Sequence, residues 1–466
     1  TSATVGFLKT IAAAVRDQKP NAMAIAFDDT SSFRKPMHAL LSYLADEQRS
    51  GMSDDAYVEM VKGICTLLKP PTPEAAAQAA QQQLGVEVPP SAAVDVRMLP
   101  GMVASKLSEE VAQTALTAPD EEGKGYKATR KERPMGFDED VHNLRQLLRA
   151  MCLPVISGGG SSLEADDLLA GLATQGAAAG YEVKIVSGDQ DLLQLVDDQK
   201  RIRVLEPSGP QTLRSAGSSA FKQLDEAGVV AKLGIPPSLV PDYKAMVGDA
   251  SDNVPGVTGI GPKNGHSLLA SYGSLDGVYS NLTKISKGVR TKLEQGRRKA
   301  YMSRFLCALS DQRLLNAGLH TGIVANIDTL RLQGFQKAEV EPLLEALEMS
   351  STLKTLPTLQ ALLGGEAAKP SVAPLTPHDL ILSPPPLEQP PAVSSLVADA
   401  GNHQAGTGSA AAAAAAADVG NHSAGAGSAT PASDAHSFAA VEAAGSHLPE
   451  AGSPAAAAAG GSQTTP

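Results

Sequence analysis

The sequence predicts an α/β fold in which a parallel β-sheet is flanked by helices. Short apolar runs, each typical of a buried strand, occur at residues 22–27, 155–156, 183–186 and 202–205. Segments in which apolar residues recur at helical spacing lie between these runs. Strands that alternate with helices join through right-handed crossovers, so we expect them to lie parallel in one sheet.

The first segment, residues 1–19, is basic, rich in hydroxyl groups and amphipathic. These properties fit a transit peptide. However, four apolar residues keep the spacing of one buried helical face. They are Leu8, Ile11, Ala12 and Val15. We therefore interpret the segment as the first helix of a domain.

Acidic residues follow two of the predicted strands. Asp28 comes directly after the run 22–27, and Asp189 comes shortly after 183–186. Ligands of parallel sheets bind at the carboxyl ends of the strands. We therefore expect Asp28 and Asp189 to lie close together at one edge of the sheet.

Seven carboxylates fall in three short clusters, which are Glu164, Asp166 and Asp167; Asp189 and Asp191; and Asp249 and Asp252. Taken alone, each cluster is compatible with helix caps and turns. Taken together, like charges at this density repel unless hard divalent cations offset them, and all-oxygen ligand sets suit Mg²⁺ or Mn²⁺. The clusters therefore predict a two-metal site that hydrolyses phosphodiester bonds.

A glycine-rich turn joins a helical stretch at residues 236–247 to a second helix. The turn contains Gly256, Gly259, Gly261 and Lys263. Backbone N–H groups in such a turn can face a phosphate, and a lysine at the following helix start adds positive charge. A plain turn is the alternative for the glycines alone. Next to Asp249 and Asp252, they predict a hairpin that grips a DNA backbone without reading bases.

With these motifs the sequence resembles the 5′-3′ exonuclease and flap endonuclease family, typified by the N-terminal nuclease domain of bacterial DNA polymerase I. Phe33 with Arg34, and the run from Gly125 to Arg130, also match family motifs. The resemblance covers residues 5–36 and 122–357. It implies a PIN-like, resolvase-like sheet domain with a C-terminal helix-three-turn-helix DNA-binding subdomain, closed by a short helix at 343–356.

The resemblance also implies roles for individual residues. Lys127 and Arg130 would be catalytic, supplying positive charge to the scissile phosphate; out of context, Lys127 would be an ordinary solvated lysine. The DNA-binding residues would be Arg34, Tyr126, Gly256, Gly259, Gly261 and Lys263. The metal ligands would be Asp28, Glu164, Asp166, Asp167, Asp189, Asp191, Asp249 and Asp252. The implied cofactors are two Mg²⁺ or Mn²⁺ ions, with K⁺ at the helix-three-turn-helix.

The implied function is metal-dependent 5′-3′ exonuclease or 5′-flap endonuclease activity in DNA replication or repair. The partner would be DNA with a 5′ flap or 5′ end, or an RNA primer paired with DNA, and we expect a monomer with no membrane association. One alternative is a structure-specific DNA-binding protein of this fold with impaired catalysis. Another is a PIN-type ribonuclease, which would not need the hairpin.

The expected domains are a catalytic domain at 1–36 and 122–230, an insert at 37–121, a DNA-binding subdomain at 231–357 and a disordered tail at 365–466. The insert is helical or partly disordered and lies at the arch, either as an arch extension or as an unspliced segment. The resemblance also places a metal-binding aspartate on a strand before the first helix. The sequence has no such strand, so we expect one ligand and one central strand to be absent.

Composition supports these boundaries. The tail is rich in Ala, Gly, Pro and Ser, and it has eight acidic residues and one lysine, so it carries most of the net charge of −11. Such a segment cannot bury enough apolar surface to offset its ordering entropy. Three widely spaced cysteines disfavour disulfides and zinc, so we expect a reducing intracellular compartment; an organelle and the nucleus are both compatible with this. Gly265, after the hairpin lysine, costs up to ~1 kcal/mol in a helix, and we expect a looser grip on DNA.

Overall fold

The computed structural model describes residues 2–28, 32–68, 99–105, 107, 112–113, 125–130, 133–157, 162–208, 219–309, 327–365 and 439–445. All of them belong to one of the two units into which the chain divides. None of the helices in these ranges combines the length and the apolar character that crossing a membrane requires.

Six strands form one sheet. They are β1 (Ala22–Phe27), β2 (Val155–Ser157), β3 (Tyr181–Val186), β4 (Ile202–Pro207), β5 (Phe221–Leu224) and β6 (Ala439–Gly445). Their order is β2-β1-β6-β3-β4-β5. β1 and β2 are parallel, as are β3 and β4, whereas β6 runs antiparallel to β1 and β3, and β5 antiparallel to β4. The predicted α/β fold is confirmed, with two antiparallel strands added to the parallel ones.

Strand β6 corrects one expectation, because its residues lie in the segment that we expected to be disordered. β6 takes the central position between β1 and β3, with Glu442 in register with Met23 on one side and Lys184 on the other. Composition could not indicate this strand, since backbone hydrogen bonds to two neighbouring strands do not depend on large apolar side chains. The other residues after 365 lie outside the described part of the chain.

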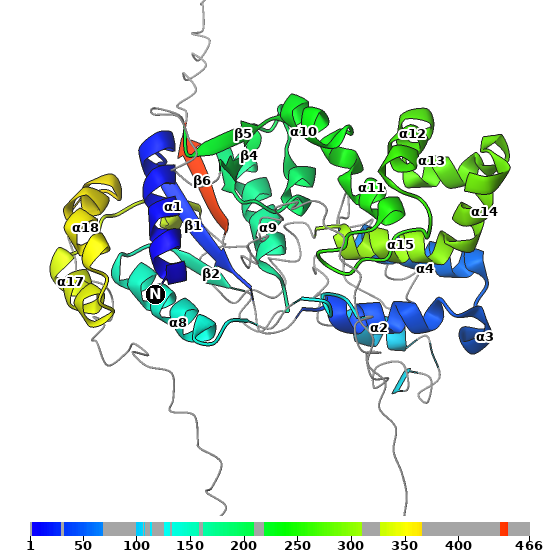
Figure 1. The fold of residues 1–466 in the computed structure, drawn as a ribbon, viewed down its shortest axis with the longest axis horizontal. Coiled ribbons are helices and arrows are strands. Elements are labelled where there is room, and N and C mark those ends of the chain that lie inside the picture. The colour runs from blue at the N-terminus through cyan, green and yellow to red at the C-terminus, as the bar shows by residue number, and fades with distance from the viewer. Residues whose placement is uncertain are drawn as a thin grey trace, which may run out of the picture. The chain divides into compact units, whose positions relative to one another are not determined.

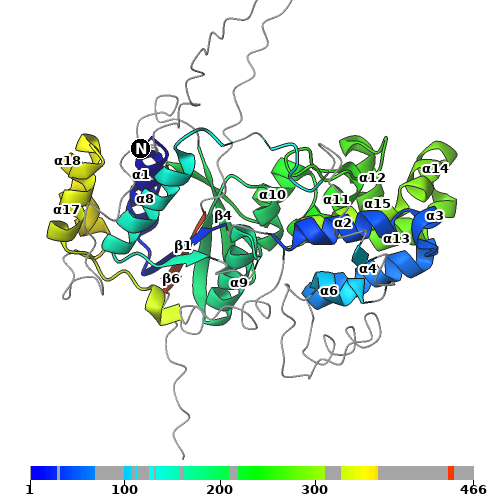
Figure 2. The ribbon, with the colours of Figure 1, turned by 90° about the horizontal axis from the view of Figure 1, so that it is seen from below.

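Helices cover both faces of the sheet (Figure 2). On one face lie α1 (Ser2–Gln18), α8 (Phe137–Ala150), α17 (Lys337–Ala346) and α18 (Ser350–Leu362), and on the other lies α9 (Ala165–Ala178). β1 shows why the sheet faces differ. Its residues Met23, Ile25 and Phe27 pack with the first group, whereas Ala22, Ala24 and Ala26 pack with the α9 side. The small alanines allow α9 to approach the sheet closely.

The predicted helix at 1–19 is α1, and its apolar face is buried except at Ala12, which is half-buried. The single closing helix expected at 343–356 is instead the pair α17 and α18. Between the sheet and the second group of helices lie η3 (Asp191–Leu195), α10 (Glu226–Leu233) and η5 (Pro237–Leu239). Asp225 caps α10 by accepting a hydrogen bond from the backbone N–H of Gly228, and Gly234 ends it in a left-handed conformation.

A second group of helices packs together, as Figure 1 shows on its right-hand side. It comprises α2 (Arg34–Leu44), α3 (Glu47–Ser50), α4 (Asp54–Leu68), α6 (Leu99–Ala104), α11 (Val240–Val247), α12 (Pro262–Tyr272), α13 (Leu275–Ser280), α14 (Lys287–Gln295) and α15 (Arg297–Cys307). The short 3₁₀ helices η6 (Leu282–Lys284) and η7 (Ile327–Leu330) complete the described elements.

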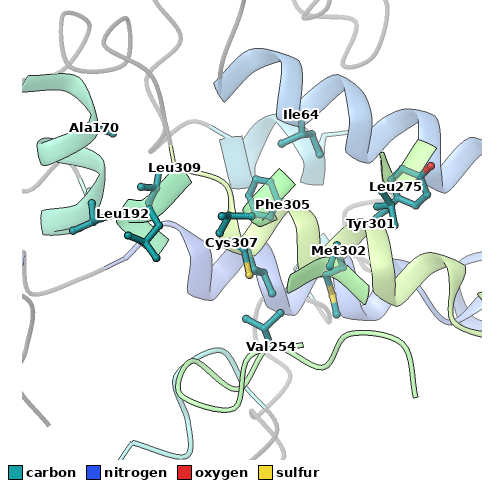
Figure 3. Packing of buried hydrophobic residues seen from close by; sticks show 14 of the residues in the cluster. Ile64, Ala170, Leu192, Val254, Leu275, Tyr301, Met302, Phe305, Cys307 and Leu309 are labelled. Atoms are coloured by element: carbon teal, nitrogen blue, oxygen red, sulfur yellow. The ribbon is translucent and has the colours of Figure 1, made fainter. Parts of the chain in front are cut away.

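The insert at 37–121, which we expected at the arch, contributes most of α2 and all of α3, α4 and α6 to this second group. In Figure 3, Ile64 of α4 lies beside Phe305 of α15. Arg298 of α15 holds the insert by donating to the carboxylate of Asp54 and to the carbonyl oxygen of Leu44. The insert packs here because its helices are amphipathic and bury their apolar faces against α15. Residues 69–98 and most of 106–124 lie outside the described part.

Candidate active site

The expected acids meet where β1 and β3 end and where α9 begins. Asp28 follows β1, and its Oδ1 accepts a hydrogen bond from the backbone N–H of Ala165 at 2.9 Å. Asp189 follows β3, and its Oδ1 accepts a hydrogen bond from the backbone N–H of Asp191 at 2.8 Å. Both carboxylates are therefore oriented by backbone donors. Their negative charges both act on a third acid, Asp166.

Asp166 is a buried carboxylate of the site with an unpaired oxygen. It lies in the first turn of α9 and is buried, with 7% of its surface exposed. Burial and the neighbouring Asp189 carboxylate raise the pKa of Asp166 well above its usual range. Its Oδ1 is buried and finds no hydrogen-bond partner among the described residues. An unpaired buried carboxylate oxygen is costly, and beside other acids it fits a hard divalent cation.

Arg34 and Asp167 form a buried ion pair, which bears on two expectations. The Arg34 guanidinium is 1% exposed and donates to Asp167 at 2.6 and 2.8 Å, and to Glu164 at 3.2 Å. It also donates to the carbonyl oxygens of Leu306 and Ala308. Arg34 is therefore not available to DNA. Asp167, 0% exposed, is occupied by Arg34 rather than open to a metal ion, because its carboxylate already has a bidentate partner.

Side chains of the turn at residues 125–130 form hydrogen bonds both to the start of α9 and to the segment before the hairpin. The buried Tyr126 hydroxyl donates to Glu164 at 3.1 Å or to Asp252 at 3.2 Å. Lys127 has a φ of 60°, and its Nζ donates to Glu164 at 2.6 Å. Arg130 donates to Asp252 at 2.7 Å. Tyr126, expected to contact DNA, instead orients two acids from inside the protein.

The Lys127 side chain in this turn keeps its positive charge. Burial alone would lower the pKa of Lys127, but the carboxylates of Glu164 and Asp252 raise it. Lys127 is therefore protonated at neutral pH and cannot act as a base. Lys127 and Arg130 lie among the acids, and in this structure each of them pairs with a carboxylate.

Lys244 of α11 is a site residue that the sequence analysis missed. Lys244 is buried, with 7% of its surface exposed, and its ammonium group contacts the carboxylates of Asp191 and Asp249. Burial would lower the pKa of Lys244, but Asp191 raises it well above its usual range. Burial raises the pKa of Asp191 to about 6 despite Lys244. Lys244 thus joins the second acid cluster to the third. A lysine four residues after the buried Val240, on the same helical face, was the available signal.

Lysine and arginine side chains therefore lie between the acids. Within the described ranges, no three His, Cys, Asp or Glu side chains converge closely enough to hold a metal ion in this arrangement. The acids that the structure brings near one another around Asp166 are Asp28, Glu164 and Asp189. Asp191, Asp249 and Asp252 lie around Lys244 and Arg130.

The hairpin residues are held together, but they differ in accessibility. Gly256, with a φ of +59°, packs so closely that a Cβ there would lie 2.4 Å from the backbone nitrogen of Gly248. Its N–H donates to the Ser303 hydroxyl at 3.1 Å, so it is not free to bind a phosphate. The space around Gly261 is open, and Lys263 is exposed. A phosphate contact at these two positions stays a prediction.

Gly259, the hairpin glycine between Gly256 and Gly261, has a φ of +81°. Its carbonyl oxygen accepts a hydrogen bond from Lys292 of α14 at 3.1 Å. A K⁺ ion at the hairpin remains a prediction.

Gly265 is required by packing, which revises the expectation of a looser grip on DNA. It is buried on α12, and a Cβ there would lie 2.7 Å from Cγ2 of Val247 on α11. Valine is stiff at χ1 and cannot move aside easily.

We expect Gly265→Ala to lower the free energy of unfolding by about 1–3 kcal/mol, in spite of alanine's better helix propensity. Adding Val247→Ala should recover part of this loss, because it removes the methyl group that clashes. Urea unfolding of the two single variants and the double variant measures the coupling. Strictly additive effects would contradict the close packing of α11 on α12.

Two family models match consecutive parts of the chain. Residues 102–234 match the 5′-3′ exonuclease N-terminal resolvase-like domain, and residues 235–330 match the 5′-3′ exonuclease C-terminal SAM fold. Among curated proteins, DNA polymerase I of Synechocystis sp. is 41% identical over 224 residues, which cover 48% of this chain and 21% of that protein. DNA polymerase I of Caldicellulosiruptor bescii is 35% identical over 231 residues, 50% of this chain and 25% of that protein.

The chain thus spans about a fifth to a quarter of the length of these relatives. Similar solved structures include the phage T5 D15 protein co-crystallized with metal ions, with a TM-score of 0.35 and 13% identity over 73% of this chain and 90% of that chain. The catalytic core of Rad2 in complex with DNA substrate has a TM-score of 0.26 and 14% identity, covering 60% and 75%. Residues 102–330 thus match, in order, the resolvase-like N-terminal domain and the C-terminal SAM fold of 5′-3′ exonucleases.

Proposed function

We propose that this protein is a metal-dependent nuclease that hydrolyses DNA phosphodiester bonds as a 5′-3′ exonuclease or 5′-flap endonuclease, in replication or repair. One observation carries the proposal. The carboxylate of Asp166 is buried with an unpartnered oxygen, beside acids that follow two strands of the sheet. Such a group is costly unless a cation binds there. The matches of residues 102–330 to the two 5′-3′ exonuclease domain models support the same conclusion.

Asp28, Glu164, Asp166 and Asp189 would hold one Mg²⁺ or Mn²⁺ ion, and Asp191, Asp249 and Asp252 would hold a second. Bound ions of this kind lower the pKa of an attacking water and stabilise the leaving oxygen. Lys127 and Arg130 supply fixed positive charge at the same place. Because Lys127 stays protonated, its ammonium group can leave Glu164 and donate to the phosphate when the substrate enters.

The proposed substrate is DNA with a 5′ flap or a free 5′ end, including a strand that begins with an RNA primer. Gly261 and Lys263 face open space at the start of α12, where the duplex backbone would bind. Contacts of this kind position the duplex without selecting its sequence. We propose that the protein acts as a monomer.

A DNA-binding protein without effective catalysis is the second candidate. The observation that favours it is the pairing of the acids with Lys127, Arg130 and Lys244. These cations offset part of the charge that a metal ion would otherwise neutralise. The two candidates predict the same DNA binding and differ only in cleavage.

We expect the full chain to cut a labelled 5′-flap DNA in Mg²⁺ or Mn²⁺ and to be inactive in EDTA. Asp189→Asn keeps an oxygen that can accept the Asp191 N–H but removes the charge. It should slow cleavage by more than the roughly 10–100-fold typical of residues one shell away from a metal ion, while DNA binding changes by no more than a few fold. If the unmodified chain binds the flap but cuts it in neither metal, the binding protein is the correct candidate.

A further inference from the structure

Helix α14 lies directly beside the hairpin. Lys292, in its last turn, donates to the carbonyl oxygen of Gly259 at 3.1 Å. Gly296, which follows the helix, packs against the hairpin so closely that a Cβ there would lie 2.7 Å from Cγ1 of Val257. Any duplex held by Gly261 and Lys263 would therefore pass near α14.

Positive charge accumulates in this part of an acidic chain. Residues 254–300 contain eight lysines and arginines but only two acids, Asp276 and Glu294. Asp276 is already bound to Lys62, Tyr301 and Arg304. Glu294 lies 3.8 Å from Arg290 on the same helix. The lysines of α14 and of the turn before it therefore meet little competing negative charge.

The orientation of α14 directs its lysines to solvent. Leu293 is buried and Val289 is half-buried, which fixes the inward face of the helix. Lys284, Lys287 and Lys292 are exposed. Neither Lys284 nor Lys287 has an acidic partner in the described part of the chain.

The exposed face between these lysines is small and uncharged. Gly288, Thr291 and Gln295 lie there, all exposed, and the position of a Cβ at Gly288 is in open space. A phosphate backbone can therefore approach α14 without meeting a bulky side chain or a carboxylate.

We propose that the DNA-binding surface continues from the hairpin onto α14, where Lys284 and Lys287 each contact a backbone phosphate of the duplex. The proposal rests on the DNA-cleaving function proposed above and names further residues for it. Neutralising phosphates releases condensed counterions, so each contact contributes to the salt dependence of binding and none depends on base sequence.

The test compares two double variants that lose the same charge. Lys284→Gln with Lys287→Gln removes the proposed contacts, and Lys222→Gln with Lys354→Gln removes two exposed lysines from β5 and α18. The affinity of each full chain for a 5′-flap duplex is measured over a range of salt concentrations. We expect the slope of log K against log salt to fall by about 0.9 for each lost contact, about 1.8 in all, for the first variant only.

Cleavage by the control variant, in which Lys222 and Lys354 are replaced, should equal that of the unmodified chain, because both lysines lie outside the proposed DNA-binding surface. If both double variants keep the unmodified slope and affinity while the unmodified chain binds and cuts flap DNA, the α14 surface is refuted and the proposed function stands. Equal losses in the two variants would also refute it, because net charge alone would then explain them. If the unmodified chain does not bind the flap duplex, the proposed function itself fails.

Discussion

Replacing Asp166 with asparagine is expected to stop DNA cleavage and, in EDTA, to make the protein more stable. The two effects have one cause. The Asp166 carboxylate is buried, and its pKa is raised by burial and by Asp189, so its charge opposes folding unless a cation is bound. Asparagine keeps the shape and loses the charge. The loss of cleavage should exceed roughly 10–100-fold, the effect of residues one shell away from a metal ion.

Urea unfolding with and without Mg²⁺ tests both effects together. Added Mg²⁺ should raise the free energy of unfolding of the unmodified chain, because the ion binds the folded state. It should do so less for Asp166→Asn. The matched control is Asp138→Asn, which removes one charge from a carboxylate that is 71% exposed. It should change neither the free energy of unfolding in EDTA nor its increase with Mg²⁺. An Asp166→Asn variant that is less stable in EDTA would show that the carboxylate has a structural partner instead.

Replacing Arg34 with methionine is expected to destabilise the fold severely, without any specific effect on DNA contacts. Asp167 is fully buried, and each of its two carboxylate oxygens accepts a hydrogen bond from Arg34. Removing one partner of a buried ion pair leaves an uncompensated charge and typically costs about 3–5 kcal/mol. The free energy of unfolding in urea should fall by this amount.

The double variant with Asp167→Asn separates the ion pair from other causes. Asp167 accepts a hydrogen bond from the backbone N–H of Glu164 at 3.3 Å. Asparagine at position 167 retains an oxygen that can accept the same hydrogen bond. The double variant should therefore recover much of the loss, although the carbonyl oxygens of Leu306 and Ala308 still lack their donors. A stable Arg34→Met protein with weakened DNA binding would restore the role that the sequence suggested for Arg34.

The sequence allowed the acids at the strand ends to be placed because their positions follow from local pattern. The run 22–27 is apolar throughout, so it forms a buried strand, and Asp28 must then lie at its end. The role of Arg34 could not be read in this way. Its partner Asp167 is 133 residues further along the chain, and only the fold brings the two together. The contacts of Tyr126 could not be read from the sequence for the same reason, since Asp252 reaches it from the hairpin.

Lys244 and β6 were missed for different reasons. Lys244 lies in a helix that was predicted, but lysine is rarely buried, and its burial depends on carboxylates from two other segments. β6 lies in a segment whose composition predicts no core. Its position depends on backbone hydrogen bonds to the edges of β1 and β3, and the sequence of residues 439–445 alone does not show that these edges are available.

The central place of β6 has a consequence for the order in which the fold is assembled. The register pair of Met23 and Glu442 is separated by almost the entire chain. Pairings over such distances slow folding, because closing a long loop costs entropy before any stabilising contact forms. During synthesis β1 and β3 are made first, and their facing edges stay open until β6 arrives. Over that interval each edge can pair with a strand of another molecule, and the timely arrival of β6 protects the nascent sheet from aggregation.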